Sequence, residues 1–580
     1  MFNCTTLAVL LPVVALLVIS IPPAEANYCI DMVLMHHDTG NSVCVDEDYV
    51  ESMIQFGFYI PDIPLPTVVP GEVPAHACLS YNNRVTFGTS FQEGVIQDTV
   101  TLSIAPSRTE STAGTSSPLY STTNIQEAKV DEPDIIKNTA TDIFLSGSQL
   151  NVIQAYPPDG ISVVGHSPIT GPALLHKDML AVFNVGGDTK ITILNVSDRT
   201  NPQILDRILI TGTMTDARLI NNTIYVITQD SPDRIPVVKY GSDAKSPDTH
   251  YFPFYMVDTR TMITAVSLES GFDAISFLTP FNMEIYVSES NMYLVMPGTG
   301  YSSGASWPPD QSTRGAICAT DTQVVKIGLS GTGLSYQGAG TVPGYPINQF
   351  AMAEKDNTFR IATTTWSGVN SAFKLDSNLD MLGAVYDIAP GETMHSARFY
   401  GDTLYLVTFR QVDPFFVIDF SESPMVVGEL KLPGFSEYLH PYDEDTVVGV
   451  GRETIEAQWG PVIDGIKVTV FDVSDPTNPT LSDFEVIDDR DAYSEIQWDH
   501  KAALISTRII SIPVTHDGVT TFHVYNIENN ILVKRGIVKH DDTDWARSLY
   551  IGDYLYTVTP GLLKVTDLNG FVPAGQIILD

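Results

Sequence analysis

The chain has 580 residues, of which 43% are hydrophobic and 9% aromatic, so a large core can form and wholesale disorder is excluded. Its 69 acidic and 31 basic residues give a formal net charge of −38, which argues against nucleic acid and anionic lipid surfaces as partners. We interpret this acidity as a solvated surface in preference to a store of cations.

Residues 1–26 have the features of a signal peptide. Leu7 to Ile21 is an apolar run of suitable length, and the cleavage motif Ala24-Glu25-Ala26 follows it. No Lys or Arg precedes the run, and an uncleaved N-terminal anchor is the alternative interpretation. We therefore expect a secreted or extracytoplasmic protein, free or associated with the cell envelope, with no membrane span in the mature chain.

Residues 27–100 are predicted to form a small cysteine-containing module, with a hairpin around residues 37–41 and a short helix within 46–58. Four cysteines remain after cleavage, and an even number in an exported chain indicates disulfides: Cys29, Cys44, Cys78 and Cys318. Cys29 with Cys44 would clip the hairpin, and Cys78 with Cys318 would tie the module to the rest of the chain. The other two pairings stay open. Residues 101–129 are predicted to be a Ser/Thr-rich linker.

From residue 130 to 580 one pattern recurs, a turn residue followed by an apolar strand. Its copies are Thr141–Phe144, Asp178–Ala181, Asn222–Tyr225, Ser290–Tyr293, Asn357–Arg360, Asp402–Tyr405, Asp445–Val448, Lys501–Leu504 and Asp553–Tyr556. A second element, a strand ending in an Asp/Ser/Pro turn, recurs at 191–202, 416–424 and 468–479. One unit is about four strands in roughly 40 to 70 residues, which is typical of a propeller blade. The sequence predicts an all-β fold, a β-propeller of 8–9 four-stranded blades behind a disulfide-clipped N-terminal module; nine units can be counted.

Several long strings carry a resemblance to a known family. They are Asn124–Lys137, Phe409–Asp419, Leu432–Ser436, Tyr438–Asp443 and Arg547–Asp553. Together they resemble the secreted prokaryotic proteins with a C-terminal β-propeller domain distantly related to WD40 repeats, over about residues 120–570. Residues 29–58 resemble a cysteine-paired module of exported archaeal proteins. The resemblance implies fold and export, and because it implies no activity, no catalytic residue is carried over from it.

Three carboxylates, Asp131, Glu132 and Asp134, stand at the start of the repeats. They are candidate ligands for Ca²⁺, which prefers oxygen donors. The favoured alternative is that they accept hydrogen bonds in turns where the first blade begins. No other cofactor is assigned.

Polar residues recur just before the repeated turn, where strands of a blade lie near the ring axis. Arg218 and Arg398 occupy equivalent places there. Comparable stretches hold His395, His440, His500, Glu437, Glu495, Asp499 and Arg547. These side chains are predicted to converge on the channel mouth, where His395, His440, His500, Glu495 and Arg398 are the candidates for acid–base chemistry. For each residue alone, a salt bridge between blades is the favoured interpretation.

The function expected from these features is binding or scaffolding, with an extracellular protein or polymer as the ligand. The alternatives are an extracellular polymer hydrolase or lyase with a His/carboxylate site at the channel, and a calcium-stabilised binding protein. The string Gly300–Gly304 matches G-x-S-x-G, but no α/β segment could host it as a nucleophile elbow. The chain has no H-E-x-x-H motif and no Gly-rich phosphate loop, so the enzyme alternative lacks a supporting signature. Asn195 and Asn221 begin glycosylation sequons, which predicts that both are exposed.

Overall fold

The computed structural model describes residues 118–579, apart from 185, 252–257, 270, 299–320, 410–412, 458–459 and 488–489. It also describes four N-terminal strands, β1 (Val33–His37), β2 (Ser42–Val45), β3 (Phe58–Tyr59) and β4 (Val68–Pro70). β1 and β2 pair antiparallel, with Val33 opposite Val45, which confirms the predicted hairpin. The signal peptide, the linker up to residue 117, and Cys29, Cys78 and Cys318 lie outside the described residues.

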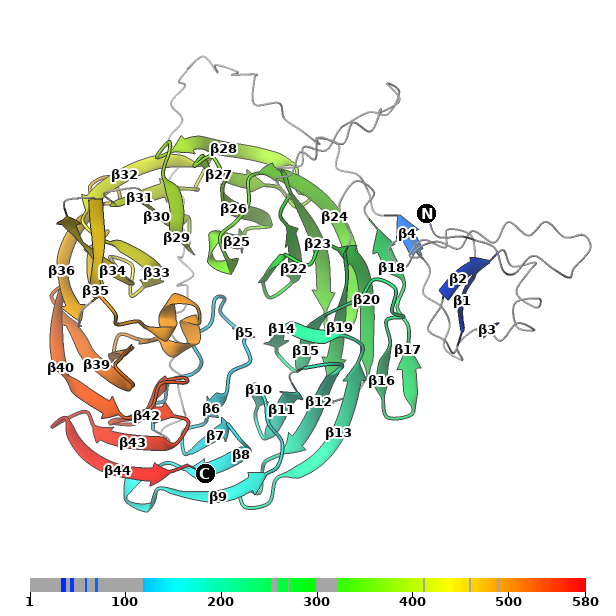
Figure 1. The fold of residues 1–580 in the computed structure, drawn as a ribbon, viewed down its shortest axis with the longest axis horizontal. Coiled ribbons are helices and arrows are strands. Elements are labelled where there is room, and N and C mark those ends of the chain that lie inside the picture. Colours follow the sequence, from blue (N-terminus) through cyan, green and yellow to red (C-terminus); the bar gives the residue numbers. More distant parts are fainter. Residues whose placement is uncertain are drawn as a thin grey trace, which may run out of the picture.

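Nine four-stranded sheets follow one another along the chain, and Figure 1 shows them arranged once around a central axis. The first three are β6 (Ile136–Asn138), β7 (Asp142–Ser146), β8 (Leu150–Gln154), β9 (Ser162–Ser167); β10 (Ala173–His176), β11 (Met179–Asn184), β12 (Thr189–Asn195), β13 (Gln203–Ile210); and β14 (Thr213–Ile220), β15 (Thr223–Asp230), β19 (Thr259–Ser267), β20 (Phe272–Thr279). The next three are β21 (Glu284–Val287), β22 (Asn291–Met296), β23 (Asp321–Ser330), β24 (Gly333–Pro343); β25 (Met352–Lys355), β26 (Thr358–Thr364), β27 (Asn370–Leu375), β28 (Met381–Ile388); and β29 (Thr393–Tyr400), β30 (Thr403–Phe409), β31 (Asp413–Asp419), β32 (Met425–Leu432).

The last three blades are β33 (Phe435–Pro441), β34 (Thr446–Ala457), β35 (Gly460–Asp472), β36 (Thr480–Ile487); β37 (Leu504–Ile505), β38 (Ile510–His516), β39 (Val519–Glu528), β40 (Ile531–His540); and β41 (Arg547–Ile551), β42 (Tyr554–Thr559), β43 (Leu562–Asp567), β44 (Val572–Ile578). Four 3₁₀ turns lie between strands: η2 (Pro158–Gly160), η3 (Gln349–Ala351), η4 (Glu495–Gln497) and η5 (His500–Ala502). The fold is thus all-β, a nine-bladed propeller, as the count of repeats predicted. Within the described residues, no helix has the length and apolar character needed to cross a membrane.

Short strands extend two of the blades. β16 (Val238–Tyr240) and β17 (Asp243–Lys245) add to the outer edge of the second blade, beside β13. β18 (Thr249–Tyr251) pairs in parallel with β20 of the third blade, and β4 from the N-terminal region pairs in parallel with β18. The N-terminal region is therefore hydrogen-bonded to the rim of the propeller.

The predicted turns precede the second strand of every blade except the eighth. Asn221 (φ 56°) and Asn357 (φ 59°) stand in the left-handed region at two of these turns, a conformation that Asn tolerates well. In the eighth blade the predicted unit Lys501–Leu504 was wrong. It forms η5, where the Asp499 side chain accepts a hydrogen bond from the Lys501 N–H, and then the first strand of the blade.

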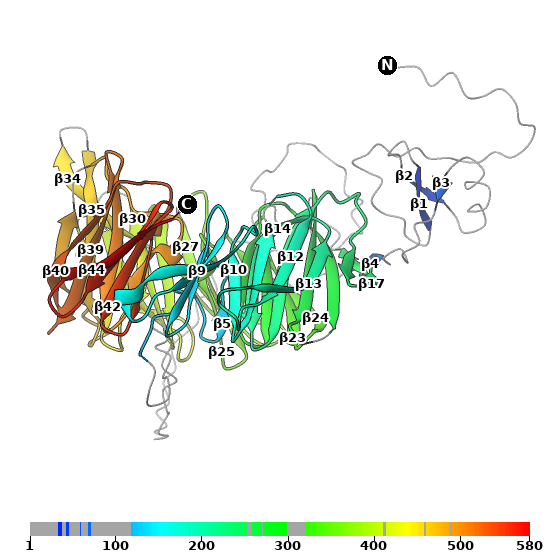
Figure 2. The ribbon, with the colours of Figure 1, turned by 90° about the horizontal axis from the view of Figure 1, so that it is seen from below.

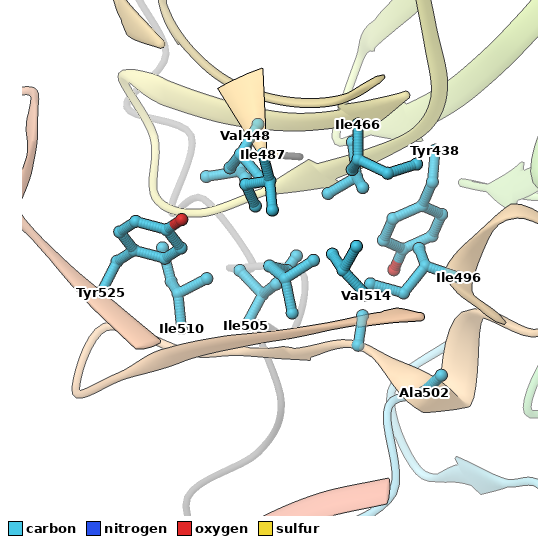
Figure 3. Packing of buried hydrophobic residues seen from close by; sticks show 14 of the residues in the cluster. Tyr438, Val448, Ile466, Ile487, Ile496, Ala502, Ile505, Ile510, Val514 and Tyr525 are labelled. Carbon is cyan, nitrogen blue, oxygen red and sulfur yellow. The ribbon is translucent and has the colours of Figure 1, made fainter. Parts of the chain in front are cut away.

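Neighbouring blades bury each other's apolar faces. Figure 3 shows one interface, where Val448 and Ile466 of the seventh blade face Ile510 and Val514 of the eighth. Turns that contain the second sequence element pack against the preceding blade: a Cβ at Gly428 on β32 of the sixth blade would lie 2.2 Å from the carbonyl oxygen of Pro476 in the seventh. Only glycine fits that contact, because any side chain there would overlap the neighbouring backbone.

The ring closes without exchange of strands, because β6–β9 alone form the first blade and β41–β44 alone form the ninth. The first and ninth blades meet through side chains, including Ile143 and Ile153 on one side and Leu549 and Val558 on the other. The buried Tyr556 hydroxyl donates to the Ala155 carbonyl across this seam, at 2.6 Å.

Residues 118–134 form a segment that we call the axial strap, which runs inside the ring. Tyr120 bridges to Ile551 of the ninth blade, and β5 (Val130–Asp131) pairs with β14 of the third. The linker predicted over 101–129 therefore differs from the structure over 118–129, where Asn124 and Ile125 are buried. Polar residues of the strap are satisfied within the ring: the Asn124 amide donates to the Tyr438 hydroxyl at 2.9 Å and to the His500 carbonyl at 2.8 Å.

Candidate functional site

The two faces of the ring differ in the length of their loops. Since strands alternate in direction within each blade, connections between second and third strands and those between blades emerge on one face, which we call the loop face. In the part of the chain that the structure describes, this face holds two long connections, one between β15 and β19, which includes β16–β18, and one between β36 and β37 (residues 488–503). On the opposite face the longest are 155–161, 196–202 and 473–479. Figure 2, a side view, shows the β34–β35 hairpin standing above the ring at the same face. Binding residues gather on loops carried by a rigid scaffold, so the loop face is the favoured side for a site.

A cavity of about 560 Å³ opens at the axis on the loop face. We call it the mouth cavity. Its wall contains five carboxylates, from Glu132, Asp216, Glu284, Glu437 and Asp499. Three groups that carry or can carry a positive charge, from Arg218, His500 and Lys501, lie in the same wall. The first strands of the blades, the axial strap and the 488–503 connection supply these residues.

Most charges of the mouth cavity are paired with one another. His500 Nε2 lies 3.0 Å from Glu132 Oε2, and Lys501 Nζ lies 2.8 Å from Asp499 Oδ1. Arg218, which is buried, is ion-paired with Asp216. Burial alone would raise the pKa of Glu132, but Arg218 and His500 hold it well below its usual range. These groups form a fixed, charged wall.

Glu284 is different. No residue that the structure describes gives its carboxyl a hydrogen bond or an ion pair. Burial, together with the neighbouring Asp216 charge, raises the pKa of Glu284 to about 7. A carboxyl with such a pKa can hold or release a proton near neutral pH, and in its ionised form it would accept a cationic group.

Exposed aromatic side chains on loops stand on the same face. Trp498, in the wall of the mouth cavity, is 66% exposed, and Phe281 and Trp366 on neighbouring connections are 70% and 80% exposed. Trp366 packs against Tyr345, with ring centroids 5.0 Å apart. Exposed aromatic rings beside carboxylates suit a ligand that carries a positive charge, because the ring face attracts cations.

Arg547 makes the most completely paired cluster near the axis. Its guanidinium contacts Asp134 at 3.0 Å and Glu495 at 2.7 Å, and it is also ion-paired with Asp499. Burial alone would lower the pKa of Arg547, but the three carboxylates raise it. Glu495 and Arg547 are thus joined as a salt bridge between blades and the strap.

Arg398 lies in a second cavity, of about 250 Å³, on the opposite side of the strap. Phe350 lines both cavities and separates them. His440 is buried behind Tyr438, whose hydroxyl lies 3.1 Å from His440 Nδ1. His395 packs on Phe409 and Phe435, and burial lowers the pKa of its imidazole. The five candidates for acid–base chemistry therefore do not share one cavity.

Each of the three candidate calcium ligands is paired with a basic side chain. Asp131 lies 2.8 Å from Lys137 Nζ, Glu132 pairs with His500, and Asp134 with Arg547. Among the described residues, no group of three His, Cys, Asp or Glu side chains gathers as a metal site. Of the sequon residues, Asn221 is exposed and Asn195 is half-buried, with its side-chain oxygen accepting from the Ser197 N–H at 2.8 Å.

Sequence reasoning did not name Asp216, Glu284, Trp498 and Lys501 as residues of the mouth cavity. Asp216 and Lys501 lie within two residues of Arg218 and His500, which were predicted, so the same reasoning could have found them. Glu284 stands on the first strand of the fourth blade at the same place as Asp216 in the third, and an alignment of the blades would have paired the two.

Several known proteins are similar to this chain. An uncharacterized protein of Archaeoglobus fulgidus is 26% identical over 552 residues, which covers 79% of this chain and 85% of that protein. An uncharacterized protein of Methanocaldococcus jannaschii is 26% identical over 577 residues, which covers 85% of this chain and 88% of that protein. Among solved structures, the C-terminal WD40 domain of Sif2 is 11% identical, covering 51% of this chain and 72% of that chain, with a TM-score of 0.30.

The family model described as "Beta propeller domain" matches residues 120–571. This range includes the axial strap from Tyr120 onward and every blade strand except β44, the last strand of the ninth blade. The chain belongs to the β-propeller domain family.

Proposed function

We propose that this chain is an extracytoplasmic binding protein whose loop face takes a cationic group, such as the Lys or Arg side chain of an extracellular partner. The observation that carries the proposal is the mouth cavity, where the unpaired Glu284 and the exposed Trp498 share one wall. The apolar leader at residues 7–21 supports an extracytoplasmic location.

Charge and shape favour a cation over an anion. Five carboxylates against Arg218, Lys501 and His500 leave the wall negative, and the whole chain carries a net charge of −38. Such a field steers cations toward the cavity and repels anions. The alternative of polymer hydrolysis has less support, because Glu495 is held by Arg547 and His395 lies outside the mouth cavity.

Binding of a tetra-arginine peptide, followed by calorimetry at fixed ionic strength, tests the proposal. We expect Trp498→Ala and Glu284→Gln each to weaken binding by roughly fivefold or more, since each removes a cation-binding group. The matched controls are Trp366→Ala, an exposed Trp outside the cavity, and Glu528→Gln, an exposed Glu on β39. Equal affinity of the mouth variants and the controls would show that the peptide binds only through the overall negative charge.

A further inference from the structure

The cavity on the far side of the strap, which we call the rear cavity, has a different character from the mouth cavity. It lies among the turns between first and second strands, with Lys355, Asp356 and Gly401 in its wall, and its volume is about 250 Å³. The strap contributes Gln126 and Glu127. The volume is just below the roughly 300 Å³ at which small-molecule sites begin, which suits a molecule of a few heavy atoms.

Arg398 is an incompletely satisfied cation in this wall. Its residue is 5% exposed, and its guanidinium lies over the Phe350 ring, 4.6 Å from the centroid. Nη2 makes one long hydrogen bond of 3.4 Å to the Gln126 carbonyl, and Nη1 is buried with no partner. A buried guanidinium is always charged and normally has a carboxylate or several carbonyl acceptors, because an unmatched buried charge is costly.

Two other arginines near the axis have the carboxylate partner that Arg398 lacks. Arg218, Arg398 and Arg547 all stand on the first strand of a blade, each directly after an alanine. Arg218 pairs with Asp216, and Arg547 pairs with three carboxylates. In the sixth blade the place of Asp216 is taken by Ser396, and no ion pair to Arg398 is present among the described residues. Arg398 therefore lacks the carboxylate partner that Arg218 and Arg547 have.

A simple anion does not fit the rest of the wall. Glu127, Glu354 and Asp356 line the same cavity, against Arg398 and Lys355, and Lys355 is paired with Asp402. Glu354 accepts hydrogen bonds from Ser288 and Asn291. Glu127 accepts one from the Tyr286 hydroxyl at 2.9 Å and lies within the electrostatic reach of Arg398. A ligand with both charges would match both ends.

We propose that the rear cavity binds a small zwitterion of the amino-acid class, with its carboxylate on Arg398 and its ammonium group toward Glu127 and the neighbouring carboxylates. The site is separate from the mouth cavity, so this proposal does not depend on the function proposed for the loop face. Its affinity depends on both charges of the ligand, since each has its own partner in the wall.

Calorimetric titration of the full chain with glycine, L-alanine and L-serine tests the proposal. Acetate and methylamine, which carry one charge each, serve as the comparison probes. We expect at least one amino acid to bind saturably, and both single-charge probes to bind roughly tenfold more weakly or worse. If none of the three amino acids binds, or acetate binds as well as the best of them, the proposal is wrong.

Variants locate the site. Arg398→Met keeps the length of the side chain and should weaken amino-acid binding by roughly tenfold or more. Glu127→Gln keeps an acceptor for Tyr286 and should weaken amino-acid binding while leaving acetate unaffected. Arg207→Met, at an exposed position on β13, is the matched control and should change nothing. Unchanged amino-acid affinity in Arg398→Met would overturn the assignment, and if that variant fails to fold, unchanged affinity in Glu127→Gln does the same.

Discussion

Charged residues near the axis fall into two kinds, those with partners and those without. Arg547 and Asp134 neutralise each other in the interior, as blade-to-blade ion pairs do. Glu284 stands at the cavity surface without a partner among the described residues, and its pKa is raised to about 7. Unsatisfied groups at a concave surface point to a ligand, whereas satisfied groups point to the fold.

The raised pKa of Glu284 makes stability depend on pH. The folded pKa of about 7 lies above the ordinary 4.5, so the folded state holds the proton more tightly than the unfolded state. Its contribution is present below pH 4.5 and is lost as pH rises through about 7. Glu284→Gln cannot ionise, and we expect it to be more stable than the wild type at pH 8, on the order of 1–3 kcal/mol, and to gain much less at pH 5.

Urea unfolding at pH 5 and pH 8 measures this difference. Glu528→Gln, at an exposed position, is the control and should show no such change between the two pH values. A gain for Glu284→Gln that is the same at both pH values would mean that Glu284 does not titrate in this range.

At the scale of elements, the axial strap connects blades that lie far apart in the chain. Its side chains reach Tyr438 and His500 through Asn124, and the Gln349 carbonyl through Gln126 at 2.6 Å. The strap is thus hydrogen-bonded to several blades at once, as a central strand of a sheet is bonded to the strands on both sides. β5 is its only regular strand.

Asn124→Ala tests the contribution of the strap to stability. Asn124 is buried, and its loss leaves the His500 carbonyl without this donor and removes one from the Tyr438 hydroxyl, so we expect a loss of about 1–3 kcal/mol. Denaturant unfolding measures it, with Asn201→Ala at an exposed turn as the control. Equal stability of the two variants would show that the strap is not held by these hydrogen bonds.

The strap also marks where sequence reasoning failed. Ser121, Thr123 and Asn124 are short polar residues of the kind that occur in exposed linkers, and composition alone assigned them there. Asn124 is held by acceptors on β33 and in the 488–503 connection, about 300 residues or more away in the chain, which no local pattern reveals. The blades were predictable because a turn followed by an alternating strand is a local signal that repeats.

At the scale of the molecule, the ring is continuous everywhere except between the first and ninth blades. The first blade contains only β6–β9 and the ninth only β41–β44, so no strand is shared across this seam. Side-chain packing of Ile153 and Leu563 and the Tyr556–Ala155 hydrogen bond join the two blades there. The nine-fold repetition was predictable from the sequence, but the way in which the ring closes was not, because it depends on contacts between its two ends.

A substitution that weakens the seam is expected to increase local opening of the first and ninth blades only. Tyr556→Phe removes the hydroxyl that satisfies the Ala155 carbonyl in a buried place, so opening of these blades should cost less. We expect faster amide hydrogen exchange in β6–β9 and β41–β44, with little change in β21–β36. Exchange that accelerates equally in all blades would show that the ring opens as a single unit.

The strap has a consequence for how the protein is made. Tyr120 is synthesised early, yet its bridge partner Ile551 lies in the ninth blade, near the end of the chain. The strap therefore cannot complete its contacts until the ninth blade has left the ribosome, although its partners on β14 are synthesised much earlier. A chain truncated before the ninth blade would lack both Ile551 and Arg547. Its strap would then lose its contacts with that blade, and the ring would not close.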